Sequence, residues 1–417
     1  MAIPKTAAEL GLMEGAPPPP EKRVNKGNFT QAPYNRWALQ HIREIVPTRE
    51  ILRGDGSVSP LRADEMDLGK LEVALGDGRR LTVNDWLQEA YTDGFAVLHN
   101  GVVVYERYFN SQTSTSLHQM FSASKSFAGT MLLVLAEQGL VDLSAPVAKY
   151  LPELKNSAYG DATVQQVLDM TVAIKYSEDY SDVNAEVMQY GLCFGIGQIP
   201  EDYPGPTEIH DYLPTLTKQG NHGEAFHYVT PDTDVVGWIV RRVTGMNLSQ
   251  VIQENLWSKL GVESDAYYWL DHAGTEMAAG GLSLSLRDAA RFGQMILQDG
   301  FYNGQQILPS SVAKKIKEPG NPDTFNRYNE EPDTTSYAYH DQWWTMNNDH
   351  KAVSAIGVYG QFIYIDPVAN MILVKQTSHS EPSRRGNEAD GPKMMHAIAK
   401  YLVRHGQMAK PTGADSK

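Results

Sequence analysis

The stretch Phe121-Ser122-Ala123-Ser124-Lys125-Ser126-Phe127-Ala128-Gly129 opens an apolar segment directly after a polar loop. Apolar side chains then recur at helical spacing as far as Leu135, and Gly139 is a typical residue to follow the last turn of a helix. Ser122 and Lys125 stand three positions apart, so a helix places both on one face. The stretch therefore predicts a helix that begins near Ser122 and brings a hydroxyl and an amine side by side.

A serine at the start of a buried helix is well placed for covalent catalysis. The N–H groups of the first turn have no partner within the helix and lie at the positive end of its dipole, so they can stabilise an oxyanion. A lysine that is partly removed from water has a lowered pKa and can accept the serine proton. One interpretation makes Ser122 the nucleophile and Lys125 its base. The other is a capping serine beside a lysine whose stem lies along apolar surface.

Other nucleophile schemes fit the chain less well. The same Ser-x-x-Lys spacing recurs at Ser311 and Lys314, but there the context is typical of a capped, charged surface helix. The chain contains no Gly-x-Ser-x-Gly elbow, no Gly-x-x-x-x-Gly-Lys-[Ser/Thr] phosphate loop and no His-Glu-x-x-His or other close metal-ligand spacing. A Ser-His-Asp triad stays open because its members can lie anywhere in the sequence, but it leaves Lys125 without a role.

Charge and composition argue against several classes of function. The formal net charge of −14 argues against binding to nucleic acid, and no window of the 417 residues is apolar enough to span a membrane. The N-terminus does not have the pattern of a signal peptide, so we expect a cytoplasmic location. The single cysteine, Cys193, excludes a disulfide framework and a multi-thiolate metal site, and is expected to be a buried, inert side chain.

Strand signals lie towards both ends of the chain. Residues 94–99 and 102–106 are β-rich and flank Asn100-Gly101, a pair that supplies the positive φ angles of a tight hairpin turn. Residues 359–365 and 371–376 form a second antiparallel pair. Helices are expected around residues 35–46, at 392–405, and in the middle of the chain from about 163 to 280, where loops such as 195–206 interrupt them.

This order predicts an α/β (α+β) fold in which an antiparallel sheet, built from both ends of the chain, is flanked by helices and interrupted by a helical domain. We expect a Pro-rich, extended arm over residues 1–30, packed over the surface. The sheet domain is expected over residues 31–165 and 281–417, and the helical domain over residues 166–280.

Over roughly residues 90–405 the chain resembles the serine β-lactamase and penicillin-recognising superfamily, above all its 6-aminohexanoate-dimer (nylon-oligomer) hydrolases and class C-like carboxylesterases. The resemblance rests first on Ser122-Ala123-Ser124-Lys125 and on Gly139-Leu140-Val141-Asp142-Leu143. It implies a β-lactamase/transpeptidase-like fold and hydrolysis through an acyl-enzyme, with no metal and no organic cofactor.

The second motif of that family, Tyr-x-Asn or Tyr-x-Ser, is matched by Tyr228-Val229-Thr230. The resemblance implies that Tyr228 relays the proton to the leaving group and then activates water, whereas a packing tyrosine at a helix start is the alternative. Thr230 stands where the family carries Asn or Ser, which leaves its role open.

The third motif, Lys-Thr-Gly or His-Thr-Gly, is replaced by Ala355-Ile356-Gly357-Val358-Tyr359-Gly360-Gln361. The cation and hydroxyl that would hold a β-lactam carboxylate are missing, so amide or ester hydrolysis is expected rather than efficient β-lactam hydrolysis. The resemblance implies that the backbone N–H groups of Ser122 and Val358 form the oxyanion hole. It also places Ile356 and Gly357 against the substrate.

Two further positions resemble the nylon-oligomer branch. Tyr180 matches the tyrosine that closes over the substrate there and hydrogen-bonds the amide leaving group, with surface packing as the alternative. Gly191 stands where efficient members carry an acidic residue that holds the substrate's ammonium group.

The predicted function is therefore a serine hydrolase acting on a small-molecule amide or ester. The oligomeric state stays open, with a homodimer as one option. A β-lactamase or D,D-peptidase-like penicillin-binding protein, and a non-catalytic acyl-binding relative, are the alternatives.

Overall fold

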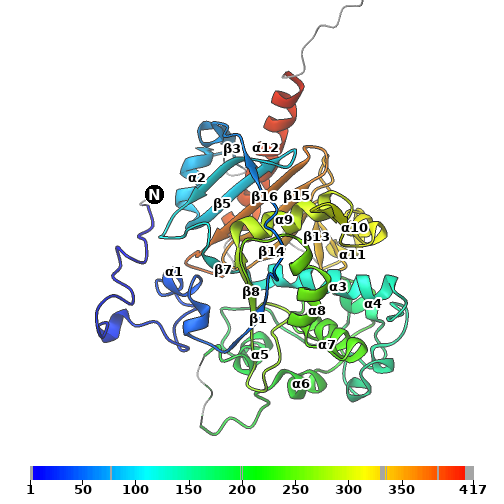
Figure 1. The fold of residues 1–417 in the computed structure, drawn as a ribbon. Coiled ribbons are helices and arrows are strands. Elements are labelled where there is room, and N and C mark those ends of the chain that lie inside the picture. The colour runs from blue at the N-terminus through cyan, green and yellow to red at the C-terminus, as the bar shows by residue number, and fades with distance from the viewer. Residues whose placement is uncertain are drawn as a thin grey trace, which may run out of the picture.

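The computed structural model describes residues 3–75, 78–197, 199, 201–328, 334, 336–382 and 385–408. Within them, the large sheet has eight strands in the order β12-β13-β14-β15-β16-β5-β6-β2, and every neighbouring pair is antiparallel except β2 and β6. Its strands are β2 Arg62–Ala63, β5 Thr92–His99, β6 Val102–Tyr108, β12 Ala338–His340, β13 Trp343–Thr345, β14 Val353–Gly357, β15 Gln361–Asp366 and β16 Met371–Thr377. Strands β5 and β16 lie side by side, so the sheet joins the two ends of the chain as predicted (Figure 1).

Both predicted hairpins are confirmed. The turn between β5 and β6 has positive φ angles at Asn100 (54°) and Gly101 (76°), as a tight turn of this type requires. Strand β15 begins two residues later than predicted because Tyr359 and Gly360 form the turn that precedes it, with φ angles of 62° and 92°. That turn borders the candidate site.

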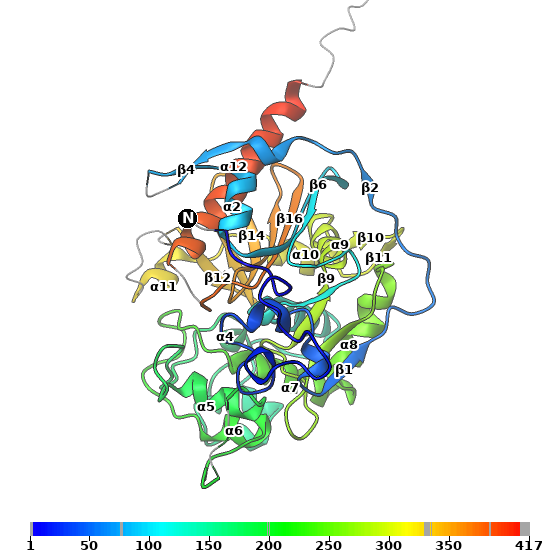
Figure 2. The ribbon, with the colours of Figure 1, turned by 90° about the vertical axis from the view of Figure 1, so that its left-hand side faces the viewer.

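Helices cover both faces of this sheet (Figure 2). The buried side chains of its strands alternate between the two layers. The covering helices are α2 Val83–Glu89 and α12 Arg385–Met408 on one face and α9 Leu286–Leu297 on the other. On β5, Phe95 packs edge to face on Trp86 of α2, with ring centroids 5.8 Å apart, while Ala96 belongs to the core on the α9 side. A Cβ added at Gly293 of α9 would lie 2.9 Å from the side chain of Ile372, so glycine there permits the close approach of helix and sheet.

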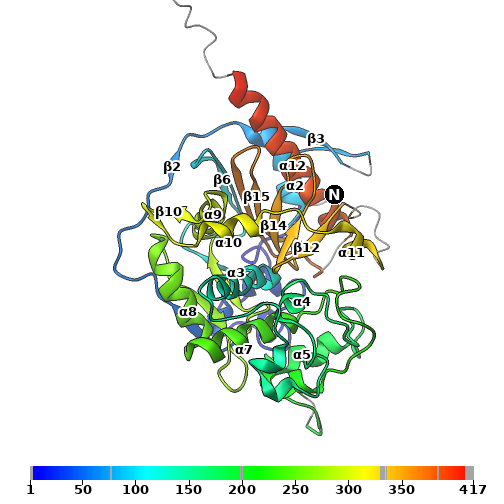
Figure 3. The ribbon, with the colours of Figure 1, turned by 90° about the vertical axis from the view of Figure 1, so that its right-hand side faces the viewer.

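The other helices lie mainly on the α3 side of the molecule (Figure 3). They are α1 Asn35–Ala38, α3 Ser124–Glu137, α4 Val164–Leu168, α5 Glu186–Cys193, α6 Ile209–Tyr212, α7 Asp232–Thr244, α8 Leu248–Asn255, α10 Ser310–Ile316 and α11 Pro322–Asn326. Helix α3, which carries the Ser-x-x-Lys motif, packs against α7 and α8. None of the described helices combines the length and the apolar character that a membrane span needs.

Smaller sheets complete the fold. In the described residues a second sheet has the order β1-β8-β9-β7, and two short hairpins pair β3 with β4 and β10 with β11. These strands are β1 Thr48–Ile51, β3 Glu72–Ala74, β4 Arg80–Thr82, β7 Leu117–Gln119, β8 Ala266–Trp269, β9 Leu282–Ser285, β10 Phe301–Tyr302 and β11 Gln305–Gln306. Strand β8 lies inside the range expected to be helical, and this part of the expectation is wrong. The backbone of β8 pairs with β1 on one side and β9 on the other, and all its residues are buried.

The expected helix over residues 35–46 is wrong in its length. The structure has α1 over Asn35–Ala38 and then a separate 3₁₀ turn over Ile42–Glu44. The carbonyl of Leu39 accepts the N–H of Gln119 at 2.8 Å, so this carbonyl bonds β7 instead of continuing the helix. A tertiary hydrogen bond here overrides the local helical pattern.

The N-terminal arm has no long regular element among its described residues and packs over the rest of the chain (Figure 2). Phe29 is fully buried, and its ring meets Trp269 edge to face at 5.3 Å. The backbone N–H of Ala7 donates to the side-chain oxygen of Asn110 at 2.7 Å. Residues 30–32, the last residue of the arm and the two that follow it, reach the candidate site described below.

Candidate active site

Ser122 lies in a 3₁₀ turn, Phe121–Ala123, between β7 and α3. Phe121 has a φ of 44°, an uncommon conformation for an aromatic residue, of a kind that clusters at functional sites. The Phe121 ring meets that of Tyr359 at 5.1 Å, and Tyr359 also has a positive φ. Helix α3 begins at Ser124, close to the predicted start, and Gly139 follows it with a φ of 76°.

Lys125 is 1% exposed and its amine has three oxygen neighbours. Nζ lies 3.0 Å from Oγ of Ser122, 2.9 Å from the carbonyl oxygen of Ala279 and 3.4 Å from Oγ1 of Thr230. The predicted juxtaposition of Ser122 and Lys125 is therefore present, and Thr230 joins it. The Ala279 carbonyl can only accept a hydrogen bond, so it fixes one N–H of the amine.

Burial lowers the pKa of Lys125 to about 8, because the charged ammonium loses its hydration. Three carboxylates, those of Glu178, Asp234 and Asp232, act in the opposite direction and favour the charged form. An ordinary lysine has a pKa of about 10.4 and is almost wholly protonated at neutral pH. At a pKa of about 8, part of the Lys125 population holds a free lone pair near neutral pH.

Tyr228 lies beside this pair. The amine of Lys125 is 5.1 Å from the centroid of the Tyr228 ring, and Trp344 stacks on that ring at 5.8 Å. Burial raises the pKa of Tyr228 well above its ordinary value, while a hydrogen bond with Ser122 lowers it by less. The phenol therefore keeps its proton at neutral pH and can donate it. Lys125, whose pKa is lowered, is the better proton acceptor of the two.

The end of β14 forms the opposite wall. A Cβ added at Gly357 would overlap the carbonyl oxygen of Met120, so the strand can approach the turn before the nucleophile only because this residue is glycine. Among the described residues, no carbonyl accepts a hydrogen bond from the N–H of Ser122 or of Val358. Both residues border the same open space.

Ser122 lies between two cavities of about 250 and 480 Å³. Tyr180 and Val358 border both of them. The first is also lined by Glu178, Tyr228, Trp344, Ile356, Gly357 and Phe362. The second is also lined by Val187, Met188, Gly191, Ile196, Thr230 and Met277. The structure thus brings every site residue that the sequence predicted, apart from the buried Lys125, to the walls of these two cavities.

Glu178 is a site residue that the sequence analysis missed. Its Oε1 accepts the backbone N–H of Thr230 at 2.5 Å and its Oε2 accepts the hydroxyl of Tyr180 at 3.0 Å. Tyr180, with 37% of its surface exposed, is therefore held over the cavity by this carboxylate. Burial raises the pKa of Glu178, and Lys125 opposes that effect. The sequence signal that could have indicated Glu178 was an acidic residue placed between two tyrosines.

Asp232 and Asp234, in the first turn of α7, were also missed. Asp232 accepts the hydroxyl of Tyr159 at 2.9 Å, and Asp234 accepts that of Tyr190 at 2.7 Å. Burial raises the pKa of Asp234 to about 7. Both carboxylates lie at the positive end of the helix dipole, which favours their charged forms.

The N-terminal arm contributes to the second cavity, which no sequence pattern indicated. Thr30, Gln31 and Ala32 line it, and the hydroxyl of Tyr359 donates to the carbonyl of Thr30 at 2.8 Å. The end of the arm and the two residues after it therefore form part of the site wall.

The structure also describes the two side chains that the sequence analysis rejected as nucleophiles, Ser311 and Cys193. Ser311 is exposed on α10 and its hydroxyl donates to Glu137 at 2.8 Å, so the predicted surface helix is confirmed. Cys193 is fully buried, and burial raises the pKa of its thiol to about 12. A thiol with that pKa is not a nucleophile at neutral pH.

The chain is similar to several known proteins. A family model described as Beta-lactamase matches residues 83–391. A 6-aminohexanoate-dimer hydrolase from Paenarthrobacter ureafaciens is 33% identical over 361 residues, which make up 86% of this chain and 89% of that protein. A solved structure from Bacillus anthracis, named after the same hydrolase, has a TM-score of 0.83 at 34% identity, covering 93% of this chain and 99% of its own.

A more distant structure shares the fold alone. The class C β-lactamase from Rhodobacter sphaeroides has a TM-score of 0.53 at 16% identity and covers 78% of this chain and 98% of its own. The predicted fold class, an antiparallel sheet flanked by helices in the β-lactamase/transpeptidase-like arrangement, is confirmed. From the extent of the family match and the identity to a named hydrolase over most of both chains, this chain is a hydrolase that belongs to the beta-lactamase family.

Proposed function

We propose that this hydrolase cleaves small amides or esters through a covalent acyl intermediate on Ser122. The observation that carries the proposal is the 3.0 Å contact between Nζ of the buried Lys125 and Oγ of Ser122. The lowered pKa of Lys125 supports its role as the base.

In the acylation step, neutral Lys125 has two N–H groups and one lone pair. The N–H groups donate to the Ala279 carbonyl and to Oγ1 of Thr230, which leaves the lone pair for the hydroxyl of Ser122. Lys125 takes that proton as Oγ attacks the substrate carbonyl. The oxyanion is held by the N–H groups of Ser122 and Val358.

Collapse of the tetrahedral intermediate breaks the bond to the leaving amine or alcohol. Tyr228 protonates the leaving group and recovers a proton from Lys125, so the serine proton ends on the product. Water then enters, gives a proton to the same relay and attacks the acyl carbonyl. Release of the acid restores the hydroxyl of Ser122, and no external reactant besides water is consumed.

The two cavities favour a substrate with an apolar chain on each side of the scissile bond. Their walls carry mostly aromatic and aliphatic side chains, and Tyr180 stands over Ser122 between them. We include 6-aminohexanoate oligomers among the substrates because two relatives carry that name. Gly191 offers no carboxylate for the ammonium group of such a substrate, so we expect turnover of the linear dimer below that of a carboxylate-bearing relative.

The proposal is tested by mass spectrometry of the intact protein during hydrolysis of a short-chain p-nitrophenyl ester. A burst with an adduct of the acyl mass on Ser122, followed by steady turnover, is the expected result. The linear 6-aminohexanoate dimer, assayed beside it, decides between amidase and esterase, and a chromogenic cephalosporin is expected to react slowly. An adduct without turnover would assign a non-catalytic acyl-binding protein, and neither adduct nor turnover would remove Ser122 as the nucleophile.

The activity is expected to rise with pH. The ammonium form of Lys125 holds no lone pair, so kcat/KM should increase tenfold per pH unit below the lysine pKa and level off above it, with a midpoint at about 8. Initial rates on an amide substrate in buffers of constant ionic strength measure this profile. A flat profile across that midpoint would remove Lys125 as the base.

Tyr228→Phe is expected to lower kcat on amides by about 10² to 10³-fold, because the poor amine leaving group needs a proton. The loss on a p-nitrophenyl ester should be much smaller, since nitrophenolate leaves without one. Tyr339→Phe is the matched control: its ring lies 6.1 Å from that of Tyr228 and its hydroxyl contacts Gln342 instead of the nucleophile. Equal losses on both substrates would point to packing rather than proton transfer.

A further inference from the structure

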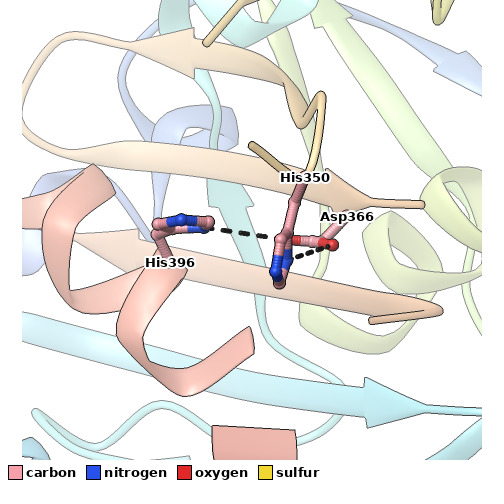
Figure 4. Close-up of side chains that lie close together, drawn as sticks. All are labelled: His350, Asp366 and His396. Carbon is pink, nitrogen blue, oxygen red and sulfur yellow. Dashed lines mark hydrogen bonds and ion pairs between the residues drawn. The ribbon is translucent and has the colours of Figure 1, made fainter. Parts of the chain in front are cut away.

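A second cluster of chemically capable side chains lies away from Ser122, on the α12 side of the large sheet. His350 comes from the connection between β13 and β14, Asp366 is the last residue of β15, and His396 lies on α12 (Figure 4). One ligand atom from each lies within 4.8 Å of the other two. Strand β15 separates the cluster from the turn at the active site, and none of the three takes part in the mechanism above.

The carboxylate of Asp366 is the centre of the cluster. It is fully buried, and Nδ1 of His350 lies 3.0 and 2.9 Å from its two oxygens. One of those oxygens also accepts the backbone N–H of Ala369 at 2.8 Å. The strand end and the loop therefore hold this carboxylate in one orientation.

The orientation of Asn348 shows which nitrogen of His396 carries a lone pair. The side-chain oxygen of Asn348 accepts the backbone N–H groups of His350 at 3.2 Å and Ala352 at 3.1 Å, so its NH₂ group must face the other way. That NH₂ lies 3.3 Å from Nδ1 of His396. An amide NH₂ can only donate, so Nδ1 accepts and bears no proton.

The contact made by the second ring nitrogen of His396, Nε2, indicates the same tautomer. Nε2 lies 2.6 Å from a carboxylate oxygen of Asp349, which can only accept while ionised, so Nε2 carries the proton. A carboxylate on the far nitrogen of an imidazole is the arrangement that orients histidine ligands in metal sites. Asp349 in turn lies 3.3 Å from the amine of Lys400, which helps to keep it ionised.

With this tautomer, Nδ1 of His396 faces a carboxylate oxygen of Asp366 at 3.9 Å with no proton between them. The single lone pair of Nδ1 accepts the Asn348 NH₂, so a cation bound between Nδ1 and the carboxylate would replace that donor and attract both atoms. In Figure 4, the dashed line that starts at His396 marks this pair.

We propose that His350, Asp366 and His396 bind a divalent transition-metal ion, with Zn²⁺ as the best match. Two imidazole nitrogens and one carboxylate are a donor set that zinc accepts, and water completes a tetrahedral site. Bonds of about 2.0 to 2.2 Å place such ligand atoms about 3.3 Å apart, which movements of about 1 Å achieve here. Binding requires the neutral ring of His350 to change tautomer, so that its proton moves from Nδ1 to Nε2 and Nδ1 becomes a ligand with no net loss of a proton.

Sequence spacing does not reveal this site, because its members stand 16 and 30 residues apart and come from three elements. The expectation of no metal came from the absence of close-spaced motifs and from the family chemistry. Neither concerns a site remote from the nucleophile. A metal here would join the β13–β14 connection, the end of β15 and α12, so its effect is expected on stability rather than on the acyl transfer.

The test uses the full chain after dialysis against a chelator and its removal. Calorimetric titration with ZnCl₂ is expected to give one saturable site with a stoichiometry of one ion per chain. At a hundredfold excess over Kd the melting temperature should rise by about 3 °C. Co²⁺ should give the strong visible absorption of a tetrahedral nitrogen and oxygen site. Absence of saturable binding by the wild-type chain to both ions would overturn the proposal without any variant.

Variants locate the site. His396→Gln should weaken Zn²⁺ binding by about 100-fold or more, and Asp349→Asn, which removes only the orienting carboxylate, by about 10 to 100-fold. His405→Gln is the matched control on the same helix, since His405 contacts Tyr401 and is not part of the cluster. Equal affinity in all three variants and the wild type would place the bound ion elsewhere and contradict the assignment.

Discussion

Ser122→Ala is expected to lower kcat by about 10⁴ to 10⁶-fold on every substrate that the native chain hydrolyses. The substitution removes the only group that forms a bond to the acyl carbon, while the N–H groups of the cavity stay in place. The acyl adduct should disappear from the mass spectrum at the same time. Substrate binding should change little, because the hydroxyl supplies little of the contact area of the two cavities.

The matched control is Ser311→Ala, which alters the other Ser-x-x-Lys sequence on the exposed face of α10. Its activity and its melting temperature should stay close to those of the native chain, because a surface hydroxyl contributes little. If Ser122→Ala kept its thermal stability and still turned over the ester with an adduct elsewhere, the nucleophile would be another residue. If both variants lost activity equally, the assay would be reporting stability.

Local sequence signals predicted the parts of the fold that short-range physics decides. The Asn100-Gly101 turn needs two positive φ angles, and those residues adopt them at little cost. The pairing of β15 with β16 follows from two β-rich runs joined by a short turn. The helix after Ser122 could be predicted because its apolar residues recur at helical spacing.

The parts that could not be predicted depend on contacts between distant residues. The carbonyl of Ala279, which fixes the amine of Lys125, lies 154 residues from it, and any residue type could supply a carbonyl. Glu178 meets Thr230 across 52 residues. The failed helix around Leu39 has the same cause, since Gln119 uses the Leu39 carbonyl.

The site residues fall into the same two groups: those that local sequence predicts and those that depend on contacts between distant residues. Ser122 and Lys125 lie within one helical turn, so their spacing alone brings them together. Tyr228, Val358, Tyr180 and Gly191 were placed at the site only by resemblance to a family, and the structure brings all four to the cavities. The buried carboxylates that oppose the lowering of the Lys125 pKa were found only through the fold, because the burial of an acidic residue cannot be read from the sequence alone.

Lys125→Arg is expected to lower kcat by about 10³ to 10⁴-fold and to abolish the rise of activity with pH that has its midpoint at about 8. Arginine keeps a long side chain, a positive charge and hydrogen-bond donors towards Ala279 and Thr230. Its guanidinium stays protonated at every pH of the assay, so it offers no lone pair to Ser122. Activity profiles over pH, measured together with the rate of adduct formation, test both effects.

The arginine variant distinguishes a role of Lys125 as a positive charge from its role as a base, whereas an alanine variant would remove both. If Lys125 acts only by charge, either by orienting Ser122 or by stabilising the oxyanion, arginine should preserve most of the rate and Lys125→Ala should not. If Lys125 acts as the base, both variants should fail alike, whereas Lys314→Ala on the surface helix should match the native chain. Turnover by Lys125→Arg within about tenfold of native would therefore move the proton transfer to another group. Tyr228, whose raised pKa makes it a poor base, would then have to act as a phenolate, and the activity would rise only at a pH well above that midpoint.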